Sequence, residues 1–246
     1  MRRTCALAML VLCSRLGAQQ AAGPIPPKEV LTYGVEWRLV RAGMAKFTWN
    51  PLHVGWEGDI HVESAGLVTK LYRVNDDYRM QVDNNLCASS IYIKSEEGKR
   101  RRETRVAFEH PRNKASYVER DLIKNADVTR KEIDVPACVH DIFGGLQKLR
   151  TMKLEPGQSI TLPISDGKKF AQVKIDAQER EEVKTPTGTY KTIRYEIHMF
   201  DNVLINRSAR CFIWLAEDAR RLPVQIRVRM QFLIGTINLL LEKDEH

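Results

Sequence analysis

The feature that most constrains the fold of this chain is an alternation of apolar and polar residues along most of its length. In residues 31–39 every second position is apolar. A period of two places alternate side chains on opposite faces of an extended chain, so this pattern predicts a half-buried β-strand. About a dozen strands are predicted in this way, and after the first they lie at 44–49, 56–62, 79–82, 90–94, 99–108, 115–120, 128–135, 159–164, 168–181, 190–200, 209–215, 222–234 and 237–241.

One segment has a helical period instead. In residues 141–151, Ile142, Leu146 and Leu149 fall on one helical face, and Asp141 is placed to cap the N-terminus. Residues 65–72 suggest no more than a single helical turn. Short turns between consecutive strands favour antiparallel pairing, and a sheet of this size must curl or be covered. We therefore predict a mainly β protein: a large curved antiparallel sheet, a half-barrel or open barrel, with one main helix at about 141–151.

The first 18 residues have the plan of a secretory signal peptide. Arg2 and Arg3 precede an apolar run at 5–12, and small residues lead to Ala18. The run is shorter than the roughly 20 residues that a membrane span requires. Cys13 leaves a lipoprotein signal open as an alternative, although the bulky residue before it does not fit one. The sequence therefore predicts export, to a periplasmic or secreted location.

The rest of the chain is expected to form a linker at 19–28 and a single β-rich domain at 29–246, because no internal linker divides it. No second apolar stretch is long enough to span a membrane. The formal net charge is +8, and loss of the three arginines of the signal leaves 8 − 3 = +5. This charge favours anionic partners, such as lipid headgroups or an envelope polymer. Nucleic acid is not an expected partner of an exported chain.

Three cysteines remain after the signal peptide. Cys211 alternates with Ile213 and Leu215, which predicts a buried core residue. Cys87 and Cys138 lie in irregular segments that are free to meet. Because two of three cysteines should pair in an oxidising compartment, we predict a disulfide between Cys87 and Cys138.

The stretch that contains Cys138, His140 and Asp141 invites a metal or nucleophile interpretation. A zinc site needs three or four ligands, and no second cluster of ligand residues exists. A bridged Cys138 is not a nucleophile, and capping of the helix explains Asp141 equally well. We therefore predict no catalytic residue, no metal and no cofactor, and interpret the protein as a non-enzyme.

Two groups of residues are candidates for binding. An apolar ligand would be lined by large aromatic side chains, which fill a core equally well: Tyr33, Trp37, Trp49, Trp56, Trp214 and Phe232. Anionic contact is predicted for the densest positive run, which equally fits a charged sheet edge that resists aggregation. Its arginines are Arg100, Arg101, Arg102 and Arg105.

The order of several short motifs resembles the bacterial domain-of-unknown-function 3108 family. The matching elements are LTYGVEW at 31–37, AG at 42–43, Asp141, LR at 149–150, LEPGQ at 154–158, DGK at 166–168, PTG at 186–188 and IWLAEDARRLPV at 213–224. The resemblance implies an exported envelope protein without an assigned activity. The last motif is also similar to the closing pattern of the LolA-type lipoprotein carriers, whose curved sheet encloses an apolar cavity, although fewer helices are predicted here.

These observations favour an exported, non-catalytic binding module for an apolar or amphipathic envelope molecule. Two alternatives remain open at this point. The first is a structural protein of the envelope that binds another envelope protein and no small ligand. The second is a hydrolase, for which the sequence offers no motif.

Overall fold

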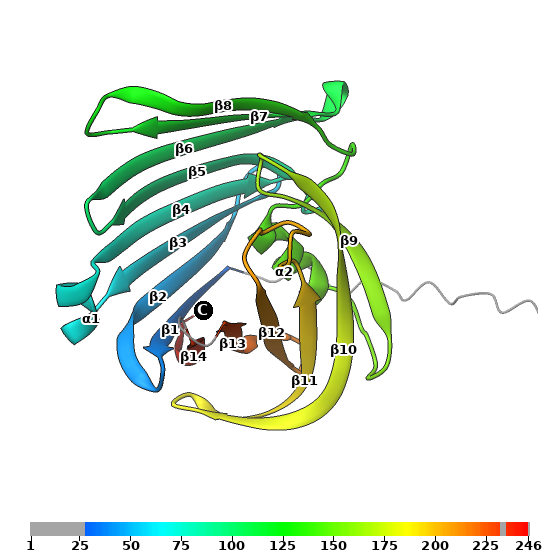
Figure 1. Cartoon of the computed structure of the whole chain (residues 1–246). Coiled ribbons are helices and arrows are strands. Elements are labelled where there is room, and N and C mark those ends of the chain that lie inside the picture. The colour runs from blue at the N-terminus through cyan, green and yellow to red at the C-terminus, as the bar shows by residue number, and fades with distance from the viewer. Residues whose placement is uncertain (1–27, 232–234, 246) are drawn as a thin grey trace, which may run out of the picture.

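The computed structural model describes residues 28–231 and 235–245. The expected signal peptide at 1–18, all of the expected linker except Lys28, and Phe232 lie outside the described residues. The described chain forms one antiparallel sheet of 14 strands, which curls into a half-barrel (Figure 1). The predicted fold class is confirmed.

The first eight strands form a simple meander in which each strand pairs with the next. A short helix, α1 (Gly66–Leu71), connects β3 to β4, and a 3-10 turn (His110–Arg112) connects β6 to β7. The strands are β1 (Glu29–Trp37), β2 (Val40–Pro51), β3 (Trp56–Ser64), β4 (Val74–Val82), β5 (Ala88–Glu97), β6 (Arg100–Glu109), β7 (Lys114–Asp121) and β8 (Ala126–Asp134).

The main helix, α2 (Ile142–Arg150), follows β8 and leads into a second meander of six strands. Its last strand pairs with β1, so the sheet order runs from β8 through β1 and β14 to β9, and β8 and β9 are its two edges. Figure 1 shows α2 inside the curve of the sheet. The strands are β9 (Ser159–Ser165), β10 (Phe170–Thr185), β11 (Gly188–His198), β12 (Ala209–Ala216), β13 (Pro223–Met230) and β14 (Thr236–Glu245).

Some strand boundaries differ from those predicted. β4 begins at Val74 rather than at residue 79, because Asp76 and Asp77 interrupt the apolar alternation but still pair with β5. β13 runs from Pro223 to Met230, and the last part of the strand predicted at 222–234, residues 232–234, lies outside the described residues. Backbone pairing thus extends strands through polar positions that carry no hydrophobic signal.

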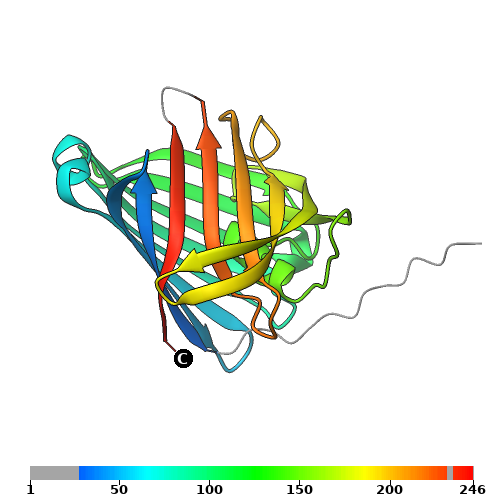
Figure 2. The same ribbon diagram turned by 90° about the horizontal axis from the view of Figure 1, so that it is seen from below.

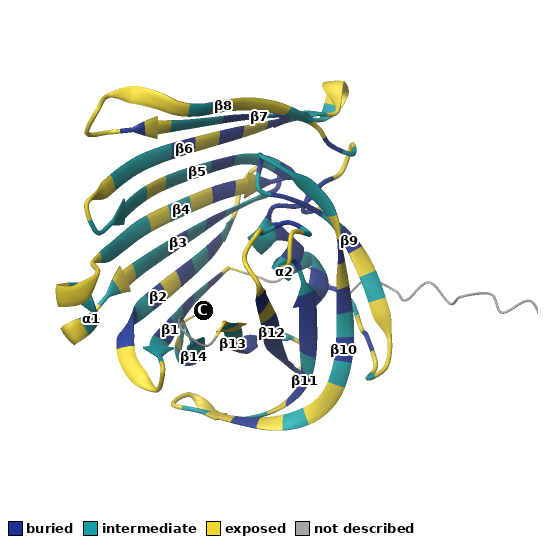
Figure 3. Ribbon diagram, in the orientation of Figure 1, coloured by how far each residue is buried: buried dark blue, intermediate teal, exposed yellow. Residues whose placement is uncertain are grey.

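Side chains alternate between an inner face, which surrounds α2, and an outer face. On β12 the inner residues Cys211, Ile213 and Leu215 pack in one cluster with Leu149 of α2. The outer face of β13 and β14 is crossed by the far part of the β10–β11 hairpin (Figure 2). Figure 3 shows that burial is concentrated around α2 and falls toward the strand tips.

The N-terminal end of α2 is held at three points. The side chain of Asp141 accepts hydrogen bonds from the backbone N–H groups of Phe143 and Gly144, as the capping prediction requires. The predicted disulfide between Cys87 and Cys138 is present, and it ties the segment before α2 to the β4–β5 connection. His140 makes an isolated parallel bridge to β9. These contacts place α2 against the inner face of β9–β13.

A candidate apolar pocket beside the main helix

An apolar pocket of about 110 Å³ lies between α2 and the inner face of the second meander. Its position follows from the alternation within each strand, which turns the aliphatic side chains of β9–β13 toward the helix. None of the described residues that line it is charged. The lining residues are Ile142, Phe143, Gly145, Leu146, Leu149, Ile164, Val173, Ile175, Ile197, Met199, Cys211, Ile213 and Ile226.

The pocket is open on one side, because part of its lining is only half-buried. Ile142, Phe143, Leu146 and Ile226 all retain partial exposure, whereas Leu149 at the closed end is 1% exposed. Apolar surface that stays in contact with water lacks the stabilisation of about 25 cal/mol per Å² that its burial would give. A dry apolar cavity of about 150 Å³ in another protein is large enough to bind benzene. The present pocket therefore suits the end of an alkyl chain or a small apolar group.

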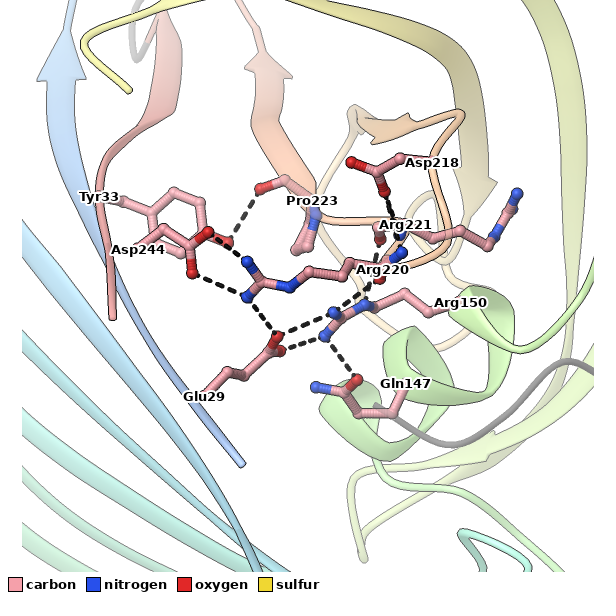
Figure 4. Close-up of polar contacts among 9 residues, drawn as sticks. All are labelled: Glu29, Tyr33, Gln147, Arg150, Asp218, Arg220, Arg221, Pro223 and Asp244. Carbon is pink, nitrogen blue, oxygen red and sulfur yellow. Dashed lines mark hydrogen bonds and ion pairs between the residues drawn. The ribbon is translucent and has the colours of Figure 1, made fainter. Parts of the chain in front are cut away.

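A buried polar network fixes the C-terminal end of α2 (Figure 4). Arg150 and Glu29 form a bidentate ion pair, with side chains that are 1% and 0% exposed. The Arg150 guanidinium also donates to Gln147 Oε1 at 2.8 Å and to the backbone carbonyls of Arg220 and Arg221 at 3.0 and 3.1 Å. All five of its N–H donors are therefore used, and the helix end is joined to β1 and to the β12–β13 turn.

The same network joins the two ends of the described chain. Arg220 makes a bidentate contact with Asp244 of β14 at 2.5 and 2.8 Å, and its other contact is Glu29 Oε2 at 3.5 Å. The hydroxyl of Tyr33 donates to the carbonyl of Pro223 at 2.9 Å. Glu29 at the start of β1 thus lies at the junction of α2, β1, β13 and β14 (Figure 4).

The residues before α2 are structural in this arrangement. Cys138 is bridged, and His140 is buried with its Nδ1 2.6 Å from the carbonyl oxygen of Leu86. Burial lowers the pKa of His140. Burial raises the pKa of Asp141, which is fully enclosed and whose Oδ2 has no hydrogen-bond partner among the described atoms. These groups position the helix. Burial of the Asp141 carboxylate costs solvation free energy, and its hydrogen bonds to the helix N-terminus offset this cost.

Cys211 lines the pocket but is not a nucleophile at neutral pH. Burial, with a smaller contribution from the charge of Glu196, raises the pKa of its thiol to about 12. The thiol is therefore protonated and behaves as a small apolar group. Within the described residues, no group of three or more His, Cys, Asp or Glu side chains is placed to hold a metal ion.

The structure brings four of the six predicted ligand-lining aromatics into one apolar cluster, away from the pocket. Tyr33, Trp49 and Trp214 are buried members of this cluster, Trp56 packs against it, and Trp49 is fully buried. The rings of Trp49 and Trp56 stack with centroids 5.6 Å apart. This stack fills the core on the β1–β4 side of the half-barrel.

Trp37 is not part of this cluster, and Trp214 joins it from β12. Trp37 ends β1, beneath the guanidinium of Arg38 at 5.4 Å. Trp214 occupies the outer face of β12, where its indole N–H donates to Glu181 Oε2 at 3.0 Å and Arg227 lies 5.0 Å over its ring. Successive side chains of a strand point to opposite faces, so Trp214 points outward because Ile213 points inward. Phe232 lies outside the described residues.

The four predicted anionic-contact arginines are spread along β6 and do not reach the pocket. Arg101, Arg102 and Arg105 each lie 3.0–3.5 Å from a carboxylate oxygen of a neighbouring side chain. Arg100, the first residue of β6, is exposed. Sequence reasoning missed the aliphatic lining of the pocket, although the helical face of α2 and the parity of Cys211 and Ile213 both signal it.

The described part of the chain has no helix with the length and apolar character that crossing a bilayer requires. The fold and the pocket together define a β-barrel-like protein in which one open antiparallel sheet curls around a helix. The family model of DUF3108, described as a protein of unknown function, matches residues 32–242. The chain therefore belongs to the DUF3108 family, as its sequence motifs indicated. No curated protein matches it.

One solved structure shares the fold at low sequence identity, and two others are less similar. A β-barrel-like protein of the DUF1849 family from Brucella abortus aligns with a TM-score of 0.59 and 8% identity, covering 90% of this chain and 98% of that one. A DUF1089 family protein from Pseudomonas aeruginosa has a TM-score of 0.41 and 10% identity, over 76% and 90% of the two chains. A candidate exported protein with a YmcC-like fold from Bacteroides fragilis has a TM-score of 0.35 and 11% identity, over 92% and 100%. The last two likenesses are too weak to carry an argument.

Proposed function

We propose that this protein is an exported binding module that holds the apolar end of an amphipathic envelope molecule between α2 and β9–β13. The observation that supports this most directly is a pocket whose described lining residues are all apolar and which is open to solvent on one side. Small-molecule sites are typically concave and mostly apolar. The predicted export signal and the disulfide between Cys87 and Cys138 favour an oxidising compartment outside the cytoplasm, where an envelope molecule would be available as a ligand.

The size of the pocket sets the expected contribution to affinity. A volume of about 110 Å³ accommodates roughly four methylene groups, if each takes about the 30 Å³ of a water molecule. At about 0.8 kcal/mol per buried CH₂, the pocket alone contributes about 3 kcal/mol. The rest of an alkyl chain would lie along the half-buried inner side chains beyond the pocket, which include Val228 and Leu239.

The polar end of the ligand is expected to remain in solvent. No cation lies among the described residues that line the pocket, and Arg150, at the end of α2, is already paired with Glu29. The proposal therefore predicts selectivity for chain length rather than for the headgroup.

A fluorescent apolar probe tests this proposal. N-phenylnaphthylamine would be titrated into the purified mature protein without detergent, and fatty acids of increasing length would then displace it. Ile226→Trp fills the open side of the pocket and should weaken probe binding about tenfold or more, the loss of about two methylene contacts. Val128→Trp on the exposed edge strand β8 is the matched control and should bind like the wild type. Equal binding by both variants, with both folded, would contradict the proposal.

A further inference from the structure

Exposed apolar side chains gather at one end of the half-barrel. Ten large apolar side chains are exposed among the described residues, and seven of them lie at the tips of the β1–β2, β3–β4 and β7–β8 connections. We call these seven the apolar rim: Leu39, Val40, Leu67, Leu71, Tyr72, Leu122 and Ile123. Consecutive turns of an antiparallel meander alternate between two ends of the sheet. The rim therefore occupies one end, at the left of Figure 1.

Backbone hydrogen bonds make the rim one continuous edge. The N–H of Ala65, which precedes α1, donates to the carbonyl of Ala42 in β2 at 2.7 Å. On the other side of α1, the N–H of Gly98 donates to the carbonyl of Arg73 at 2.7 Å. The next link is the N–H of Leu122, which donates to the carbonyl of Arg101 at 3.0 Å. At about 4.8 Å per strand, the four hairpin tips from β1–β2 to β7–β8 span about 29 Å.

The helix α1 is the most conspicuous part of the rim. None of its six residues is buried. Leu67 and Leu71 are one helical turn apart, so they point to the same side, and they are 70% and 78% exposed. Tyr72 follows them and packs its ring over Gly98 of the neighbouring β5–β6 turn. The apolar face of α1 therefore covers nothing within the described chain.

The connections at this end carry charges of one sign. The connections at 38–39, 65–73, 98–99 and 122–125 carry no aspartate or glutamate. Their five cations are Arg38, Lys70, Arg73, Lys99 and Lys124. The connections at the opposite end of the same strands, 52–55, 83–87 and 110–113, hold one aspartate and one arginine. The formal charge of the connections is therefore +5 at the rim and zero at the other end.

We propose that the apolar rim docks on a membrane surface that carries anionic headgroups. Leucine, isoleucine and tyrosine side chains would enter the interfacial layer, while the interleaved lysines and arginines stay at the level of the headgroups. A protein partner fits less well, because lysine is depleted at the centre of protein interfaces and here it separates the apolar residues. The proposal does not depend on the pocket beside α2.

Co-sedimentation with lipid vesicles tests the proposal on the mature full-length protein. Binding is expected to vesicles of phosphatidylethanolamine mixed with phosphatidylglycerol, to be weaker on phosphatidylcholine alone, and to fall as salt screens the charges. The double variant Leu67→Ser and Leu71→Ser should lose about tenfold or more of the vesicle affinity, since both side chains leave the interface. Its matched control is Leu52→Ser with Val54→Ser, two exposed residues at the opposite end, which should bind as the wild type does.

The outcomes separate this proposal from the pocket. Absence of binding to anionic vesicles, equal binding by the α1 variant, or an equal loss in the control variant would each overturn docking through the rim. The fluorescent probe titration is made without vesicles, so its result reports on the pocket alone. A variant that loses vesicle binding but keeps probe binding would support the rim as a separate surface.

Discussion

Replacing Arg150 with methionine is expected to destabilise the protein strongly, because the change removes a fully used guanidinium from the core. Methionine keeps much of the side-chain volume but offers no donor. The loss leaves the carboxylate of Glu29 buried, with Arg220 at 3.5 Å as its remaining ion-pair contact. It also removes the donor to Gln147 Oε1 and to two backbone carbonyls of the β12–β13 turn.

The magnitude follows from the burial of the pair. Breaking a buried ion pair by removing one partner typically costs about 3–5 kcal/mol. Since the side chains of Arg150 and Glu29 are 1% and 0% exposed, solvent screening does not reduce this value much. For a domain of this length, 1 kcal/mol corresponds to about 2–4 °C in the midpoint of thermal unfolding. The midpoint should therefore fall by about 6–20 °C.

Urea denaturation of the wild type, Arg150→Met, Glu29→Met and the double variant provides the assay. Removing both charges leaves no isolated buried ion, so the double variant should be markedly more stable than the sum of the single changes predicts. A single-variant loss below about 1 kcal/mol, or strict additivity in the cycle, would refute the reasoning. Because the pair anchors the end of α2, Arg150→Met should also weaken probe binding in the pocket.

Three further predictions concern the neighbourhood of α2. Replacing both Cys87 and Cys138 with alanine should lower the free energy of unfolding by about 4 kcal/mol, the chain-entropy value for a sequence separation of 51 residues, as measured by urea denaturation. Asp141→Asn should match the wild type near pH 4 and become the more stable protein as the pH rises to neutrality. The reason is that burial raises the pKa of Asp141, so the wild type loses stability as this carboxyl ionises; unfolding measured at several pH values checks it. Cys211 should resist iodoacetamide at about pH 8 in the folded protein and react fully in urea, because burial raises its pKa to about 12.

Local patterns predicted the elements of this fold well. Most of the alternation in 31–39 became β1, which ends at Trp37, and Asp141 caps α2 because its carboxylate accepts hydrogen bonds from two backbone N–H groups. Each of these outcomes depends on residues within a few positions of one another. In the first half of β4, polar residues interrupt the hydrophobic alternation, so the sequence pattern does not predict a strand there. The backbone nevertheless pairs with β5.

Local sequence patterns did not predict which distant residues contact one another. Glu29 and Arg150 are 121 residues apart, and the sequence around each of them contains no pattern that predicts their ion pair. Their contact depends on β1 pairing with β14 and on α2 lying inside the curl of the sheet, which are properties of the whole topology. None of the described aromatic candidates lines this pocket, for a related reason. Large aromatic rings mark burial in general, whereas the parity of Trp214 against Ile213 decides which face each residue joins.

The existence of an open apolar pocket nevertheless follows from a simple comparison of sizes. A sheet of 14 strands at about 4.8 Å per strand is about 67 Å wide along its curve. A nine-residue helix is about 13.5 Å long and about 10–12 Å across with its side chains. One such helix cannot cover the inner face of this sheet. The aliphatic side chains of β9–β13 that contact α2 form a buried core with it. The side chains just beyond the helix stay half-buried. The pocket lies at the boundary between these two groups of side chains. The buried network at Arg150 has a physical role in this arrangement, because a short helix with one packed face needs a fixed end to hold that boundary in place.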